Sequence, residues 1–139
     1  MRKVITLILV LAMTPLIPVY ASTPIQRWRP PVAVDESNDI RQNWVAWTYW
    51  SPERGFWIVY NPNMMAQYPW HMQVFIRAHE YGHVNTAQHP GHKEANADCW
   101  GAWSLAQTDP DIVRAVLNTL ENVTREHDRA EVVRKCSGL

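Results

Sequence analysis

The chain has 139 residues, with 13 basic and 13 acidic side chains, so its formal net charge at pH 7 is zero. This balance gives no electrostatic case for binding nucleic acid or an anionic membrane surface. The length suits one compact domain and is too short for two. Eight tryptophans are unusual for this size. They provide large buried area in a small core, or the lining of a groove.

The first 21 residues predict a secretory signal peptide. A basic pair at residues 2–3 precedes the uncharged apolar run 4–13, and Val19 and Ala21 put small residues at the −3 and −1 positions of a cleavage site. The alternative is a retained membrane anchor, but two prolines interrupt the run well short of the roughly 20 residues that a span needs. We therefore expect export to the periplasm or the extracellular space, with no membrane span after cleavage.

Residues 22–42 predict an extended arm, because three prolines lie among polar residues there. Its composition suits a segment that covers a cleft and equally suits a tether. We place the folded domain at residues 43–139. The aromatic and β-branched stretches 43–50 and 56–60 flank a turn, a pattern that predicts an antiparallel β-hairpin.

Four helices are expected after the hairpin. The first begins between Asn63 and Pro69 and ends near Thr86, and its early residue His71 is expected to be exposed. The second covers about residues 93–106. The third follows an Asp-Pro pair at 109–110, an N-cap and a first helical proline. The fourth covers about 125–136. A hairpin or small sheet followed by about four helices is an α+β fold.

The first helix contains the sequence His79-Glu80-x-x-His83. Residues four apart lie on one face of a helix, so both imidazoles can bind one metal ion. Glu94, in the next helix, is a candidate third ligand that leaves the fourth position open, the His₂Glu pattern of catalytic zinc sites. We therefore expect one Zn²⁺ ion. The alternative is that the two histidines only pair with Glu80 on a solvated helix face.

The neighbouring carboxylates have distinct expected roles. Glu80 is offset by about 100° from His79, so its carboxylate can reach a metal-activated water and act as general base. Asp98 lies one turn after Glu94 and can accept a hydrogen bond from the far nitrogen of a ligand histidine. Gly82, within the motif, is small enough for close approach.

The two cysteines, Cys99 and Cys136, both follow the metal motif. An even number in an exported chain favours a disulfide. Two free thiols, or thiolate metal ligands, are the alternatives.

The residues His79-Glu80-x-x-His83 and Glu94-x-x-Ala97-Asp98 resemble the gluzincin class of zinc metallopeptidases, and the second motif is similar to that of small bacterial envelope peptidases. The resemblance implies a small zincin-like domain, in which an edge strand holds extended peptide. Residues 57–60 fit that strand. Zinc peptidases also need a donor for the tetrahedral oxyanion. His127 and Arg129 are candidates, or they are simply surface polar residues.

The sequence thus predicts an enzyme, an exported zinc metallopeptidase that hydrolyses peptide bonds of a peptide or protein substrate, with Glu80 as general base. One alternative is a zinc amidase that acts on cell-wall amide bonds. Another is a non-catalytic, zinc-stabilised envelope or accessory domain that binds a partner through its aromatic hairpin. The sequence does not indicate an oligomeric state.

Overall fold

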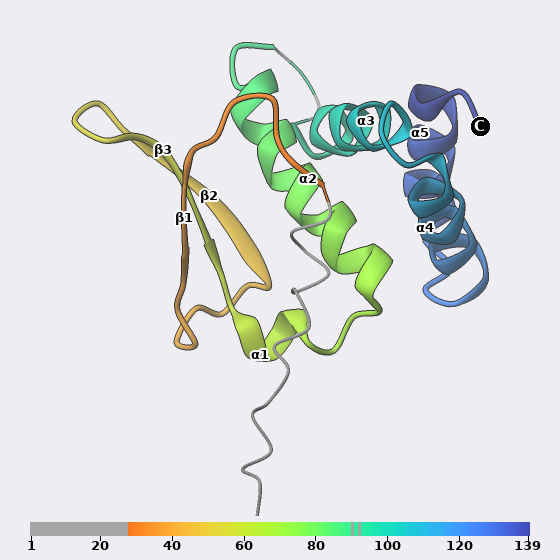
Figure 1. Ribbon diagram of the computed structural model, residues 1–139, viewed down its shortest axis with the longest axis horizontal. Coiled ribbons are helices and arrows are strands. Elements are labelled where there is room, and N and C mark those ends of the chain that lie inside the picture. Colours follow the sequence, from red (N-terminus) through yellow and green to blue (C-terminus); the bar gives the residue numbers. More distant parts are fainter. Residues whose placement is uncertain (1–27, 90, 92) are drawn as a thin grey trace, which may run out of the picture.

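The computed structural model describes residues 28–89, 91 and 93–139. The predicted signal peptide and the first residues of the arm, up to 27, lie outside the described residues. The described chain folds into a three-stranded sheet followed by helices, so the predicted α+β class is confirmed. Helix α2 (Trp70–Thr86) separates the sheet from helices α3 (Lys93–Ala106), α4 (Pro110–Asn122) and α5 (His127–Ser137), as Figure 1 shows.

The sheet contains the predicted hairpin and one strand that the sequence did not predict. Strands β2 (Ala46–Ser51) and β3 (Gly55–Tyr60) pair antiparallel. Strand β1 (Asp35–Asn38) lies within the segment expected to be an extended arm, and it pairs parallel with the other side of β3. The strand order is therefore β1-β3-β2. The expectation that residues 57–60 form an edge strand is wrong, because β1 covers that edge; β2 is the edge strand of the hairpin.

Local capping explains where several helices begin. A short helix, α1 (Pro62–Met65), precedes α2, and the Asn61 side chain accepts hydrogen bonds from its first turn. Asp109 caps α4 in the same way, and proline follows each cap, as expected for the first helical position. The bounds of α3 agree with the predicted helix 93–106. None of the described helices combines the length and the apolar character needed to cross a membrane.

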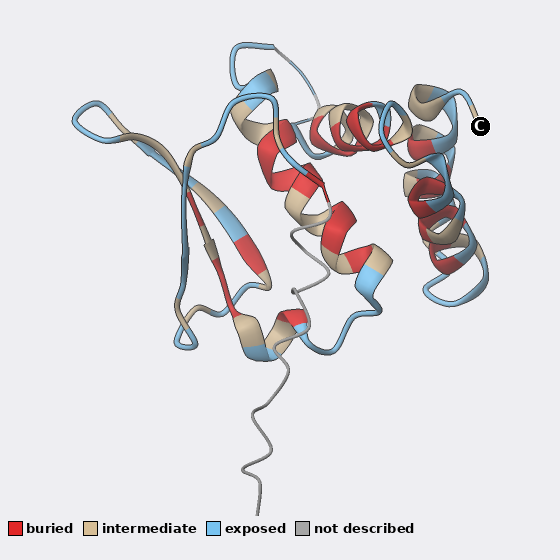
Figure 2. Cartoon of the chain, viewed as in Figure 1, coloured by how far each residue is buried: buried red, intermediate tan, exposed pale blue. Residues whose placement is uncertain are grey.

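The core lies where α2 meets the sheet on one side and α3–α5 on the other, as the distribution of buried residues in Figure 2 shows. Helix α4 contributes a complete apolar face: Ile112, Val113, Val116, Leu117 and Leu120. Trp28, from the predicted arm, is 2% exposed. Its ring packs edge-on against Tyr81 and Trp100, and its Nε1 donates to Ser104 Oγ at 3.2 Å. The arm from Trp28 onward is thus part of the folded domain.

An ionic cluster holds this arm to the rest of the domain. Arg77, on α2, donates from Nε and Nη2 to the two carboxylate oxygens of Glu36, on β1, at 2.8 and 2.7 Å. Arg77 also donates to the main-chain oxygen of Trp28, and the Tyr60 hydroxyl donates to Glu36 at 2.7 Å. We call Glu36, Tyr60 and Arg77 the arm clasp. It fastens the start of the described chain to α2 and to the central strand.

Candidate metal centre

Helices α2 and α3 approach each other closely because glycines lie where they cross. A Cβ added to Gly82 would lie 2.4 Å from the main-chain oxygen of Ala97. A Cβ added to Gly101 would lie 3.1 Å from the main-chain carbon of Ala78 and from the nitrogen of His79. The close approach expected at Gly82 is thus to α3, and Gly101 is a second contact point that the sequence did not predict. A glycine inside a helical pattern is the signal that could have identified it.

This crossing brings the predicted ligands together. The imidazoles of His79 and His83 lie one turn apart on α2, with ring centroids 4.7 Å from each other. With Glu80 they form a group whose possible ligand atoms lie within 4.8 Å of one another. His79 and Glu80 are buried and His83 is half-buried. The three side chains therefore have the types and the spacing that a metal ion requires.

Glu94, at the start of α3, faces both imidazoles. Its Oε2 lies 3.2 Å from His79 Nε2, and its Oε1 lies 3.5 Å from His83 Nε2. In a tetrahedral site with bonds of 2.0–2.1 Å, neighbouring ligand atoms lie about 3.3 Å apart. Each imidazole Nε2 has a Glu94 oxygen at close to that separation, so the donor types and their proximity fit one zinc ion.

Asp98 orients His79 from the opposite side of the ring. Its Oδ1 lies 2.6 Å from His79 Nδ1, and the carboxylate is almost fully buried. Burial lowers the pKa of His79, but its bonds to Asp98 and Glu94 outweigh burial and raise this pKa to about 9. The imidazole thus has a carboxylate oxygen at each nitrogen. An arrangement of this kind needs a proton or a metal ion between Nε2 and Glu94.

Arg129 holds the Asp98 carboxylate in turn. Its Nε and Nη2 donate to Asp98 Oδ2 and Oδ1 at 2.8 and 2.7 Å, and its Nη1 donates to Glu126 at 3.1 Å. Burial raises the pKa of Asp98, but the bonds from Arg129 and His79 outweigh burial and hold this pKa below its ordinary value. The Asp98 bonds are likewise the main cause that raises the pKa of Arg129.

The predicted oxyanion donors thus occupy two different positions. Arg129 lies beside the cavity described below, but its guanidinium is engaged by Asp98 and Glu126. His127 is exposed at the first turn of α5, and it is not among the described residues that line the cavity. The structure brings Arg129 to the ligand set and leaves His127 outside it.

Glu80 is fixed by a residue that sequence reasoning missed. The Thr48 hydroxyl, on β2, lies 2.7 Å from the Glu80 carboxylate and 3.1 Å from its main-chain oxygen. Burial raises the pKa of Glu80, and the bond from Thr48 opposes part of this rise. A carboxyl with a raised pKa is suited to accept and return a proton near neutral pH. No local signal could identify Thr48, because its role depends on how β2 packs against α2.

A cavity of about 1380 Å³ opens over these residues, between β2, α2 and the ends of α4 and α5. Its wall includes the indoles of Trp44 and Trp47, which are 61% and 46% exposed. His71 was expected to be exposed; instead it is half-buried in the cavity wall, with Nε2 2.7 Å from Thr119 Oγ1. The cavity combines an apolar wall with a few convergent polar groups, as ligand sites do.

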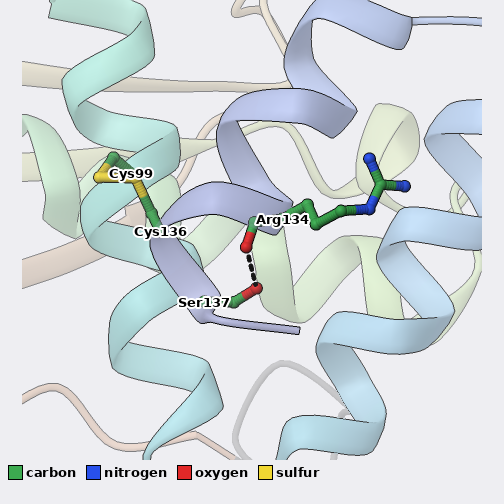
Figure 3. Close-up of a disulfide and its surroundings, with 4 residues drawn as sticks. All are labelled: Cys99, Arg134, Cys136 and Ser137. Atoms are coloured by element: carbon green, nitrogen blue, oxygen red, sulfur yellow. Dashed lines mark hydrogen bonds between the residues drawn. A yellow bond between two sulfur atoms is a disulfide. The ribbon is translucent and has the colours of Figure 1, made fainter.

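The two cysteines form the expected disulfide. The Sγ atoms of Cys99 and Cys136 lie 2.08 Å apart, and the bond joins α3 to α5 (Figure 3). No free cysteine remains among the described residues. The disulfide is consistent with an exported protein.

Comparison with known proteins leaves the site to be interpreted from its geometry. No family model matches the chain, and no curated protein or solved structure matches it.

Proposed function

We propose that this chain is an exported zinc-dependent metallopeptidase with His79, His83 and Glu94 as ligands of one Zn²⁺ ion. The observation that carries the proposal is the convergence of both imidazole Nε2 atoms on the two oxygens of one carboxylate, at 3.2 and 3.5 Å. Because the catalytic His₂Glu set uses three protein ligands, one position remains for water or substrate. A bound zinc ion would supply Lewis-acid chemistry, which lowers the pKa of its water toward about 7.

The protein residues around this position have complementary roles. Glu80 takes a proton from the attacking water and later delivers it to the leaving nitrogen of the peptide, which its raised pKa favours. Thr48 holds the Glu80 carboxylate, and Asp98 fixes the His79 imidazole. Neither residue needs to touch the substrate.

Strand β2 supports a peptide as the substrate. It is an edge strand of the described sheet, and its residues from Ala46 to Thr48 line the cavity beside Glu80. An extended peptide can add to such an edge by main-chain hydrogen bonds. The exposed indoles of Trp44 and Trp47 provide apolar contact area at the same rim.

The decisive experiment compares the wild-type protein with Glu80→Gln. Zinc content is measured by metal analysis, and cleavage is followed on casein, a peptide library and peptidoglycan. We expect zinc in both proteins and a loss of about 10²–10⁴-fold in hydrolysis in the variant, the usual contribution of a general base. Glu53→Gln, the same change on the exposed β2–β3 turn, is the matched control and should retain full activity.

Each other outcome selects another function. Cleavage of peptidoglycan without cleavage of peptides favours the cell-wall amidase. Bound zinc with no difference between wild type and Glu80→Gln on any substrate favours the non-catalytic accessory domain. Wild-type protein without stoichiometric zinc contradicts the metal centre itself.

A further inference from the structure

Helix α5 is fastened to α3 at two points that are adjacent on α3. Asp98 accepts hydrogen bonds from Arg129, and the next residue, Cys99, is bonded to Cys136. On α5, Arg129 and Cys136 lie seven residues apart, which is about two helical turns. Near its start, α5 is thus bonded through Arg129 to Asp98 beside the candidate metal centre. Near its end, Cys136 joins it covalently to Cys99 on α3 (Figure 3).

Helix α5 docks with a narrow apolar face. This helix has 11 residues, and only Ala130 and Val133 are buried. A helix of this length is marginal on its own in water, so its position depends on tertiary contacts. Beside the packing of Ala130 and Val133 in the core, the disulfide and the Arg129–Asp98 pair are two specific attachments of α5 to α3.

The Arg129–Asp98 pair bears directly on a predicted metal ligand. Oδ1 of Asp98 is shared between Arg129 Nη2 at 2.7 Å and His79 Nδ1 at 2.6 Å. Bidentate contact with a planar guanidinium fixes the plane of a carboxylate. That plane sets where Oδ1 meets the imidazole, and therefore the direction in which His79 presents Nε2 to a metal ion.

We propose that Arg129 is a positioning residue whose hold on Asp98, and through it on His79, depends on the Cys99–Cys136 disulfide, so that opening the disulfide lowers the affinity for zinc. The inference rests on the metal site of the proposed function. An external dithiol would open the bond by thiol–disulfide exchange: two electrons and two protons pass to the two sulfur atoms, and the dithiol becomes a disulfide. Cys99 and Cys136 are both half-buried rather than enclosed.

The test measures the Kd for zinc by competition with a chromophoric chelator. The variants are Arg129→Met, Cys99→Ser/Cys136→Ser and the triple combination; serine leaves no thiol that could itself bind zinc. We expect each of the first two to weaken zinc binding about 10-fold or more, the usual effect of losing an outer partner of a ligand. We expect the triple variant to bind zinc no more weakly than Cys99→Ser/Cys136→Ser. The reason is that the disulfide and Arg129 act through the same linkage to Asp98, so breaking it twice has no further effect.

Two further variants separate positioning from general stability. Arg134→Met removes the ion pair of the same helix with Glu121 on α4, and it should leave the Kd for zinc unchanged. Arg129→Lys keeps the charge and should restore part of the affinity. The melting temperature of the metal-free protein is measured for every variant, because a purely structural role would change that temperature without changing the Kd for zinc.

The outcomes are distinct. Zinc binding as tight as wild type in Arg129→Met, or in the disulfide variant, overturns the inference while the proposed function stands. If the loss of zinc affinity in the triple variant equals the sum of the losses in Arg129→Met and in the disulfide variant, Arg129 does not depend on the disulfide. If the disulfide variant does not fold, Arg129→Met and Arg129→Lys with the disulfide intact still decide the positioning role. Wild-type protein that binds no zinc overturns the proposed function and the inference together.

Discussion

Helix α2 carries ionic clusters on two opposite sides, and they differ in charge balance. Arg77 and His79 are two residues apart, which places them about 200° apart around the helix. In the arm clasp, one guanidinium meets one carboxylate and the charges cancel. In the candidate metal centre, the carboxylates of Glu94 and Asp98 flank the His79 imidazole, Glu80 lies beside it, and the Arg129 guanidinium is shared between Asp98 and Glu126. The clasp is electrostatically complete, whereas the centre has an excess of negative charge that a divalent cation can neutralise.

The largest expected difference between the two clusters is in zinc affinity. Glu94→Ala removes a proposed ligand and should weaken zinc binding by more than about 100-fold, beyond the 10–100-fold range of an outer partner. Glu36→Gln removes the carboxylate of the arm clasp and should leave the Kd unchanged. Isothermal titration with zinc tests both variants. Similar affinities in Glu94→Ala and wild type would contradict the assignment of Glu94 as a ligand.

Separating α2 from α3 should damage the centre and leave the clasp intact. In Gly82→Ala the added methyl group meets the main-chain oxygen of Ala97, which cannot rotate away, so the helices must move apart. We expect the free energy of unfolding of the metal-free protein to fall by about 1–3 kcal/mol. Urea denaturation measures this loss. Gly101→Ala, with a longer separation of 3.1 Å, should lose less. Equal stability of Gly82→Ala and wild type would exclude a tight crossing.

Breaking the arm clasp should lower stability without changing metal binding. Arg77→Met removes the charged partner of Glu36. The Glu36 side chain is only 28% exposed, so water cannot fully replace that partner. We expect a loss of about 1–3 kcal/mol, typical of hydrogen bonds to a charged group. Differential scanning calorimetry measures the loss, and Arg114→Met, at an exposed ion pair, should change stability by less than about 1 kcal/mol. A changed Kd for zinc in Arg77→Met would show that the two clusters are coupled.

The smallest expected effect is the pH dependence of the clasp. Burial raises the pKa of Glu36, but the bonds from Arg77 and Tyr60 outweigh burial and hold it below its ordinary value. A carboxyl whose pKa is lowered on folding stabilises the protein above its unfolded pKa, about 4.3, and that contribution is lost as the pH falls through the lower folded value. The melting temperature of wild type should therefore exceed that of Glu36→Gln at pH 7, and the difference should shrink below about pH 4. A constant difference from pH 7 to pH 3 would contradict this linkage.

The features that could be predicted are those set by residues close together in the sequence. The Asp109 cap, the extent of α3 and the hairpin of β2 and β3 follow from local preferences that the packed structure keeps. The pairing of β1 with β3 was missed because Asp35–Asn38 has no alternating apolar pattern and all four of its residues are exposed. Its partner strand lies about 20 residues away, and this pairing moves β3 from the edge of the sheet to its centre.

The sequence by itself determined which donor atoms this protein carries and how they repeat along each helix. His79 and His83 share a face because the helical repeat requires it. Only the tertiary structure decided that Glu94 faces both imidazoles, that Thr48 holds Glu80, and that Arg129 bonds to Asp98 rather than standing free. These contacts join different helices and strands. They depend on the close approach at Gly82 and on the docking of α5, which packing sets and no local preference encodes.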